Sequence, residues 1–99
     1  KTAWCAAFVN AALGAKGEEG TGKLNARSFL QWGEPVDKPQ VGDVVVFSRG
    51  NSEWQGHVGF YAGTDSKGNI KVLGGNQSDK VSIQTYNKSN LLGYRRGNL

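Results

Sequence analysis

The sequence predicts an α+β domain in which helices come first and an antiparallel sheet follows. Apolar residues crowd residues 3–13 as in a buried helix, and after Pro35 and Pro39 the chain changes to short runs of β-forming residues. Glycine makes up 15 of the 99 residues, which is typical of a turn-rich fold. A chain of this length suits a single modest core, so we expect one domain over residues 1–99.

Two short helices are expected in the first third of the chain. Residues 3–13 are apolar on nearly all sides, which predicts a buried helix with Thr2 as its N-cap and Gly14 as its C-cap. Residues 25–32 carry apolar side chains at the i, i+3 and i+4 spacing and are followed by Gly33, which indicates a second helix.

The remaining two thirds of the chain predict five short strands, which would form a five-stranded antiparallel sheet or a small barrel with the first helix packed against it. The expected strands are residues 44–48, 57–63, 70–75, 80–84 and 91–95. Residues 64–69 have strong turn chemistry and should join the second and third strands in a hairpin.

Charge and hydropathy exclude several classes of protein. The formal net charge is +4, but the lysines and arginines are dispersed, and Arg95 and Arg96 form the only basic pair. Nucleic-acid binding needs a concentrated basic patch, which is missing here, so no nucleic-acid partner is expected. An anionic polymer such as bacterial cell wall fits the charge as well. The longest apolar run, residues 44–47, is far too short for a membrane span. With no methionine and no leader we expect a mature or trimmed chain, acting as a monomer.

Cys5 and His57 are the only cysteine and the only histidine, and together they are the minimum requirement for a cysteine nucleophile and its base. Cys5 falls in the first turn of the expected helix, where unpaired N–H groups and the helix dipole favour a thiolate. Its backbone N–H is also the nearest candidate donor to an oxyanion. One thiol and one imidazole cannot supply a metal site, and no cofactor is expected.

The expected hairpin supplies a third residue. If Gly63 faces Ile70, then His57 lies opposite Asn76, and directly opposed side chains share one face of the sheet. The amide oxygen of Asn76 would accept the Nδ1–H of His57 and aim Nε2 at the thiol. A register slip of one residue would offer Gln77 or Gly75 instead.

The same residues resemble a known family. The resemblance spans nearly the whole chain and rests on six motifs: residues 3–10 (AWCAAFVN), 20–28 (GTGKLNARS), 39–47 (PQVGDVVVF), 56–61 (GHVGFY), 72–77 (VLGGNQ) and 92–96 (LGYRR). In this order they resemble the NlpC/P60 and CHAP superfamily of cysteine peptidases, within it most closely small NlpC/P60-like proteins of phage endolysins and bacterial wall hydrolases.

The resemblance implies a papain-like core and hydrolysis of a peptidoglycan amide through a thioester, at the bacterial cell wall in the periplasm or outside the cell. An endopeptidase acting on stem or cross-link peptides is favoured over an N-acetylmuramoyl-L-alanine amidase. Position by position, Cys5 matches the nucleophile, His57 the base and Asn76 the polar third residue. Trp4, Trp54 and Gln77 are the candidates for substrate contact; Trp54 stands in a polar loop just before His57 and could stack on a sugar.

Two departures from the family pattern stand out. Many CHAP members have a glutamate two residues before the asparagine, and here that position is Gly74. Only residues 1–4 precede Cys5, so we expect an upstream helix to be missing.

Two alternatives to a peptidoglycan hydrolase are a non-catalytic, SH3-like wall-binding module and an acyltransferase with the same triad. Asp43 is expected to be a turn or strand-start residue, and Trp32 a core residue.

Overall fold

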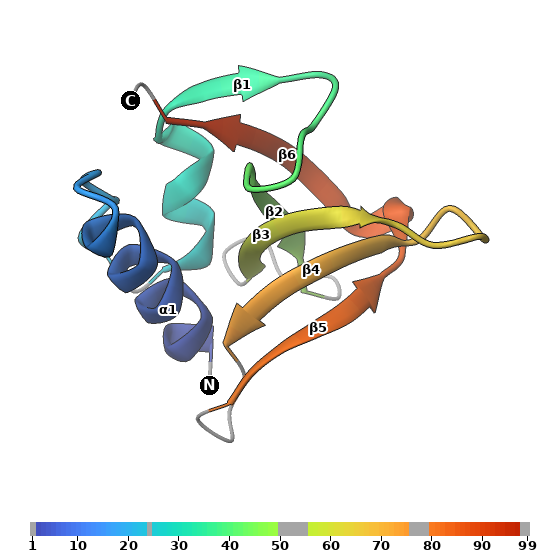
Figure 1. Ribbon diagram of the computed structural model, residues 1–99, viewed down its shortest axis with the longest axis horizontal. Coiled ribbons are helices and arrows are strands. Elements are labelled where there is room, and N and C mark those ends of the chain that lie inside the picture. Colours follow the sequence, from blue (N-terminus) through green and yellow to red (C-terminus); the bar gives the residue numbers. More distant parts are fainter. Residues whose placement is uncertain (1, 24, 50–55, 76–79, 98–99) are drawn as a thin grey trace.

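The computed structural model describes residues 2–23, 25–49, 56–75 and 80–97. In this part of the chain one α-helix and two short 3-10 helices accompany a six-stranded antiparallel sheet (Figure 1). The elements in chain order are α1 (Thr2–Ala15), η1 (Ala26–Gln31), β1 (Glu34–Val36), β2 (Val44–Ser48), β3 (Gly56–Thr64), β4 (Ile70–Gly75), β5 (Val81–Tyr86), η2 (Lys88–Asn90) and β6 (Leu91–Arg96). The predicted α+β class is confirmed.

The sheet is open, and its strand order is β1-β6-β2-β3-β4-β5. The predictions of five strands and of a closed barrel are therefore wrong. The sequence does not predict the additional strand, β1, because Pro35 lies in its middle. Proline is tolerated there because β1 is an edge strand, which pairs on one side only, with β6.

The first helix is longer than predicted at both ends. Thr2 is already helical rather than an N-cap, and the helix runs through Gly14 to Ala15. It ends in a Schellman motif, in which Gly17 has a φ of 82° and Glu18 N–H donates to the Leu13 carbonyl at 2.9 Å. Two glycines lie near this end of the helix, and Gly17 is the one that adopts the left-handed conformation that ends it.

The second predicted helix exists, but as the 3-10 helix η1. Asn25 is its N-cap, and the Asn25 side chain accepts a hydrogen bond from the Arg27 backbone N–H at 2.8 Å. Phe29 is fully buried, and Trp32 packs edge-to-face on it with ring centroids 5.7 Å apart. Trp32 packs against the core but is only partly buried, so the expectation of a core residue is met in part.

Strand β2 is buried on both faces and divides the core into two clusters. Val44 and Val46 face α1 and form the helix-side cluster with the buried residues of that helix, of η1 and of β3. Val45 and Phe47 point to the other face and form the outer cluster with Ile70 and Val72. Figure 1 shows α1 lying against one face of the sheet, across β3 and β4.

The hairpin between β3 and β4 has the predicted register over part of its length. Tyr61 lies opposite Val72, as predicted, but Ile70 lies opposite Thr64 rather than Gly63. The one-residue shift is a bulge at Gly63, whose φ of 111° is a conformation that side chains other than glycine rarely adopt.

Asp43 is a structural carboxylate at the start of β2, as the sequence indicated. Only 5% of Asp43 is exposed, and its oxygens accept hydrogen bonds from Arg96 Nε at 2.8 Å and Arg96 Nη2 at 2.7 Å. It also accepts from the Gln40 backbone N–H at 2.7 Å. The hydrogen bonds from Arg96 lower the pKa of Asp43, so this interaction ties the end of β6 to β2 at neutral pH.

We expect Asp43→Asn to lower the free energy of unfolding by about 1–2 kcal/mol, because the buried bidentate bond to Arg96 is lost while the exposed half of that guanidinium limits the effect. Urea unfolding of the wild type and the variant measures it. Asp37→Asn removes an exposed carboxylate outside the helices and strands and should change the stability little; equal losses in the two variants would contradict the assigned role of Asp43.

Candidate active site

Cys5 lies in the first turns of α1 and is buried, with 2% of its surface exposed. Desolvation by burial raises the pKa of its thiol above that of an ordinary cysteine, and it outweighs the backbone hydrogen bonds at Val58, Ala6 and Cys5 itself, which lower the pKa. The sequence-based expectation of a thiolate favoured by the helix start is therefore wrong for this arrangement. At neutral pH the thiol is protonated.

His57 is the second residue of β3 and lies directly opposite Phe47 of β2. Burial, together with the positive charge of Arg49, lowers the pKa of His57 to about 4. The imidazole is therefore neutral at pH 7, and so is the thiol. Both groups are held in their uncharged forms by the same cause, removal from water.

Cys5 and His57 approach the start of β3 from different faces of the sheet. Cys5 belongs to the helix-side cluster, where its thiol meets the backbone of Val58. His57, one residue earlier, belongs with Phe47 to the outer face. The nucleophile candidate thus meets β3 at the residue that follows the base candidate.

Tyr86, the last residue of β5, is a site residue that sequence reasoning missed. Its hydroxyl lies 2.9 Å from Nε2 of His57, and the two rings stack with centroids 4.7 Å apart. Phe47 stacks on the same tyrosine with centroids 4.9 Å apart. Nε2, the nitrogen that the sequence reasoning assigned to the thiol, is thus bonded to Tyr86.

The sequence held one signal for Tyr86, which is its place in an alternating pattern with Ser82 and Gln84 along β5. The structure pairs Gln84 with Val72 and Tyr86 with Ile70, which puts these side chains on the outer face of the sheet. The predicted strand ended at residue 84, two residues short of the tyrosine. The registers of the β3–β4 and β4–β5 hairpins must both be known before Tyr86 can be placed beside His57, which lies two strands away.

Arg49, directly after β2, adds a positive charge to this neighbourhood. Its charge opposes the burial that raises the pKa of Cys5 and of Tyr86, and it adds to the burial that lowers the pKa of His57. Arg49 therefore acts electrostatically on all three groups. A cation here favours any negative charge that develops on the sulfur or on a bound carbonyl oxygen.

The other predicted site residues are not placed by the structure. Trp54, Asn76 and Gln77 lie outside the described residues, so the triad position of Asn76 stays a prediction. Trp4 is part of α1, but its side chain is outside the described part. Within the described ranges, no group of three His, Cys, Asp or Glu residues could hold a metal ion.

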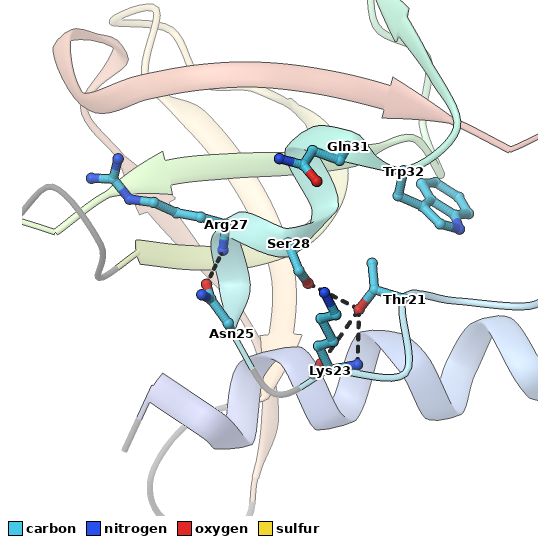
Figure 2. Close-up of a pocket in the computed structure, with 7 residues that line it drawn as sticks. All are labelled: Thr21, Lys23, Asn25, Arg27, Ser28, Gln31 and Trp32. Atoms are coloured by element: carbon cyan, nitrogen blue, oxygen red, sulfur yellow. Dashed lines mark hydrogen bonds between the residues drawn. The ribbon is translucent and has the colours of Figure 1, made fainter.

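A polar groove of about 510 Å³ runs along η1 and the segment before it (Figure 2). Its lining residues are polar or aromatic, and none of them is acidic: Thr21, Lys23, Asn25, Arg27, Ser28, Gln31 and Trp32. At one end, Arg27 packs beside Gly56, where a Cβ would lie 3.2 Å from Arg27 Cγ. Because Gly56 precedes His57, this end of the groove adjoins the strand that carries the base candidate.

Comparison with known families identifies the chain. The model of the CHAP domain family matches residues 1–76, which is more than half of the chain and includes both Cys5 and His57. The chain belongs to the CHAP family. A CHAP domain indicates a peptidoglycan hydrolase in general terms, acting on the cell wall, without naming the bond that is cut. A search of curated proteins gives no match.

The family assignment confirms the resemblance to the CHAP and NlpC/P60 cysteine peptidases. Tyr86 lies beyond the residues that this CHAP match covers. In the described part of the chain, no helix is long and apolar enough to cross a bilayer.

The lowered pKa of His57 predicts that the domain loses stability as the pH falls from about 6.5 to about 4. In this window the unfolded chain binds a proton at His57 that the folded chain does not bind. The free energy of unfolding therefore falls by up to about 1.4 kcal/mol for each pH unit of acidification. Denaturant unfolding at pH 4.5 and pH 7 measures the difference.

His57→Gln is the matched variant for this measurement, because it keeps a polar side chain that cannot titrate. It should flatten the pH dependence between pH 4.5 and pH 6.5. Asp43 has a lowered carboxyl pKa and contributes only at lower pH. An unchanged slope in the variant would show that His57 is not held neutral by burial.

Proposed function

We propose that this CHAP domain is a cysteine endopeptidase that cleaves an amide bond in the stem or cross-link peptides of peptidoglycan. The observation that carries the proposal is that Cys5, the only thiol, interacts with the backbone of Val58, the residue directly after His57, the only imidazole. The charge of Arg49 acts on both groups. The CHAP match over residues 1–76 supports peptidoglycan as the substrate.

Cys5 is the nucleophile and His57 the base. Since both groups are neutral at pH 7, the proton leaves the Cys5 thiol for the imidazole as the sulfur attacks the amide carbonyl. The imidazolium then gives this proton to the leaving amine, and the acyl group remains on the sulfur as a thioester. Water attacks the thioester with His57 again accepting a proton, and the free thiol is restored.

Negative charge develops on the carbonyl oxygen during both attacks. The Cys5 backbone N–H at the helix start is one donor to this oxygen, and the guanidinium of Arg49 stabilises the charge at longer range. Asn76 is proposed as a further polar residue beside His57, on the strength of the β3–β4 register continued beyond the described pairs.

The groove along η1 supports a peptide carrying carboxylates as the bound part of the substrate. Lys23 and Arg27 are its charged lining residues, and both are cations. Trp32 adds an aromatic face at the other end of the groove (Figure 2). We place the carboxylate-bearing part of the stem peptide against Lys23 and Arg27, on the η1 side of the scissile bond.

Amidase activity at the junction of sugar and peptide is the closest alternative, and transfer of the acyl group to a second amine would use the same residues. A non-catalytic, SH3-like wall-binding module is the alternative from another class. A binding module would leave the muropeptides intact, whereas each enzyme creates new termini of its own kind.

We expect Cys5→Ala to abolish cleavage of purified cell walls, because no other thiol can form the acyl intermediate. Mass spectrometry of the muropeptides after digestion measures cleavage and names the bond from the new termini. The loss of one sulfur in a buried site requires a folding control by circular dichroism. Digestion at the wild-type rate by a folded Cys5→Ala protein would exclude the proposed function.

We expect Lys23→Gln to raise KM for wall peptides about two- to fivefold and to leave kcat unchanged, since it removes one exposed charge from the groove. Lys38→Gln removes an exposed lysine outside this groove and serves as the control. The effect should vanish with a substrate whose carboxylates are amidated. Equal KM values for Lys23→Gln and the wild type would place the substrate elsewhere.

A further inference from the structure

The hydrogen bonds around Tyr86 determine which nitrogen of His57 carries a proton. A tyrosine hydroxyl has a single hydrogen to donate. The Tyr86 hydroxyl donates it to Gln84 Oε1, two residues earlier on β5, at 3.2 Å. Toward His57, 2.9 Å away, the same oxygen can then only accept, so the hydrogen of that bond belongs to Nε2 of the imidazole.

The neutral ring has one N–H, so a hydrogen on Nε2 leaves Nδ1 with a free lone pair. From this chain of bonds, His57 to Tyr86 to Gln84, we infer that Tyr86 is the positioning residue that fixes the His57 tautomer and makes Nδ1 the basic nitrogen. This inference rests on the proposed function for its catalytic consequence. The tautomer is inferred from the hydrogen bond to Gln84, which takes the single hydrogen of the Tyr86 hydroxyl and does not depend on that function.

Packing holds Tyr86 in place for this role. Its ring stacks on Phe47 with an interplanar angle of 22° and on His57 with an angle of 25°. Phe47 is 1% exposed and lies opposite His57 in the β2–β3 ladder, so the two partners of the tyrosine are fixed to each other by the sheet. The hydroxyl therefore has little freedom to leave Nε2.

Gly74 of β4 makes the reach of Tyr86 possible. Strand β4 lies between β3 and β5, and a side chain at position 74 would stand between the histidine and the tyrosine. A Cβ built on Gly74 lies 3.6 Å from Nε2 of His57, so anything longer than a methyl group would compete with the hydroxyl for that nitrogen.

Tyr86 acts on the imidazole and not on the substrate. The cavity that it lines together with His57, Gly74 and Gln84 measures only about 10 Å³. A space of this size holds about one water molecule, so no part of a wall peptide fits into it. The contribution of Tyr86 to the reaction is thus to orient the base, as an asparagine or carboxylate does in other cysteine and serine hydrolases.

Nitrogen NMR of the full chain labelled with ¹⁵N-histidine tests the inference directly, because His57 is the only histidine and gives the only pair of ring signals. At pH 7 the wild type should show a protonated Nε2 and an unprotonated Nδ1. A protonated Nδ1 in the wild-type protein would overturn the inference, whatever the enzyme cleaves. This readout does not depend on activity.

Tyr86→Phe keeps the stacked ring and removes only the hydroxyl. We expect the tautomer preference to weaken and kcat for wall peptides to fall roughly tenfold, with KM unchanged, because the ring still packs but no hydroxyl holds the imidazole hydrogen on Nε2. Tyr94→Phe is the matched control, since Tyr94 belongs to the outer cluster and pairs with Tyr61 instead of His57. It should leave both readouts unchanged.

The outcomes separate this inference from the proposed function. If Cys5→Ala still cleaves walls and His57 shows the Nε2–H tautomer, the function is wrong and the positioning role of Tyr86 on the ring stands. If Cys5 is required but Asn76→Ala, and not Tyr86→Phe, changes the tautomer and kcat, Asn76 is the orienting residue and the inference falls. An unfolded Tyr86→Phe protein leaves the wild-type tautomer as the deciding measurement.

Discussion

The burial of β2 on both faces is the constraint on which the rest of this structure depends. Residues 44–47 are all at most 1% exposed, so the strand needs an apolar partner on each side of the sheet. On one side the partner is α1, which is apolar nearly all round and brings Cys5 with it. On the other side it is the outer cluster, whose member Phe47 supports the rings of Tyr86 and His57.

The two reactive groups thus belong to two separate cores that share one strand. The thiol belongs to a helix that packs on one face of the sheet. The imidazole belongs to strand β3 and shares the other face with Phe47. Both are connected to the start of β3, because the thiol meets the backbone of Val58 and His57 is the residue before it. A loss of packing in either core would therefore misplace one partner of the pair.

Burial also decides the electrostatics of the site. The first turns of a helix and a nearby arginine both favour a thiolate, yet desolvation outweighs them at Cys5 and keeps the thiol neutral. The same desolvation keeps His57 neutral. A neutral pair must transfer its proton during the attack, so the direction in which the lone pair of His57 points matters more than it would for a pre-formed ion pair. The hydrogen bond between Tyr86 and His57 is the contact that we propose fixes this direction.

The sequence by itself determined the α+β class, the boundaries of β2 and β4, and the candidacy of Cys5 and His57, because these depend on local periodicity and on residue types that occur once in the chain. It misplaced the cap of α1, which lies at Gly17, and it did not recognise β1, where Pro35 is acceptable only because the strand is at an edge. Only the tertiary structure decided the partner of the base. Tyr86 reaches His57 across Gly74 through the registers of two hairpins, and no pattern along the chain records which side chains two separate ladders bring together.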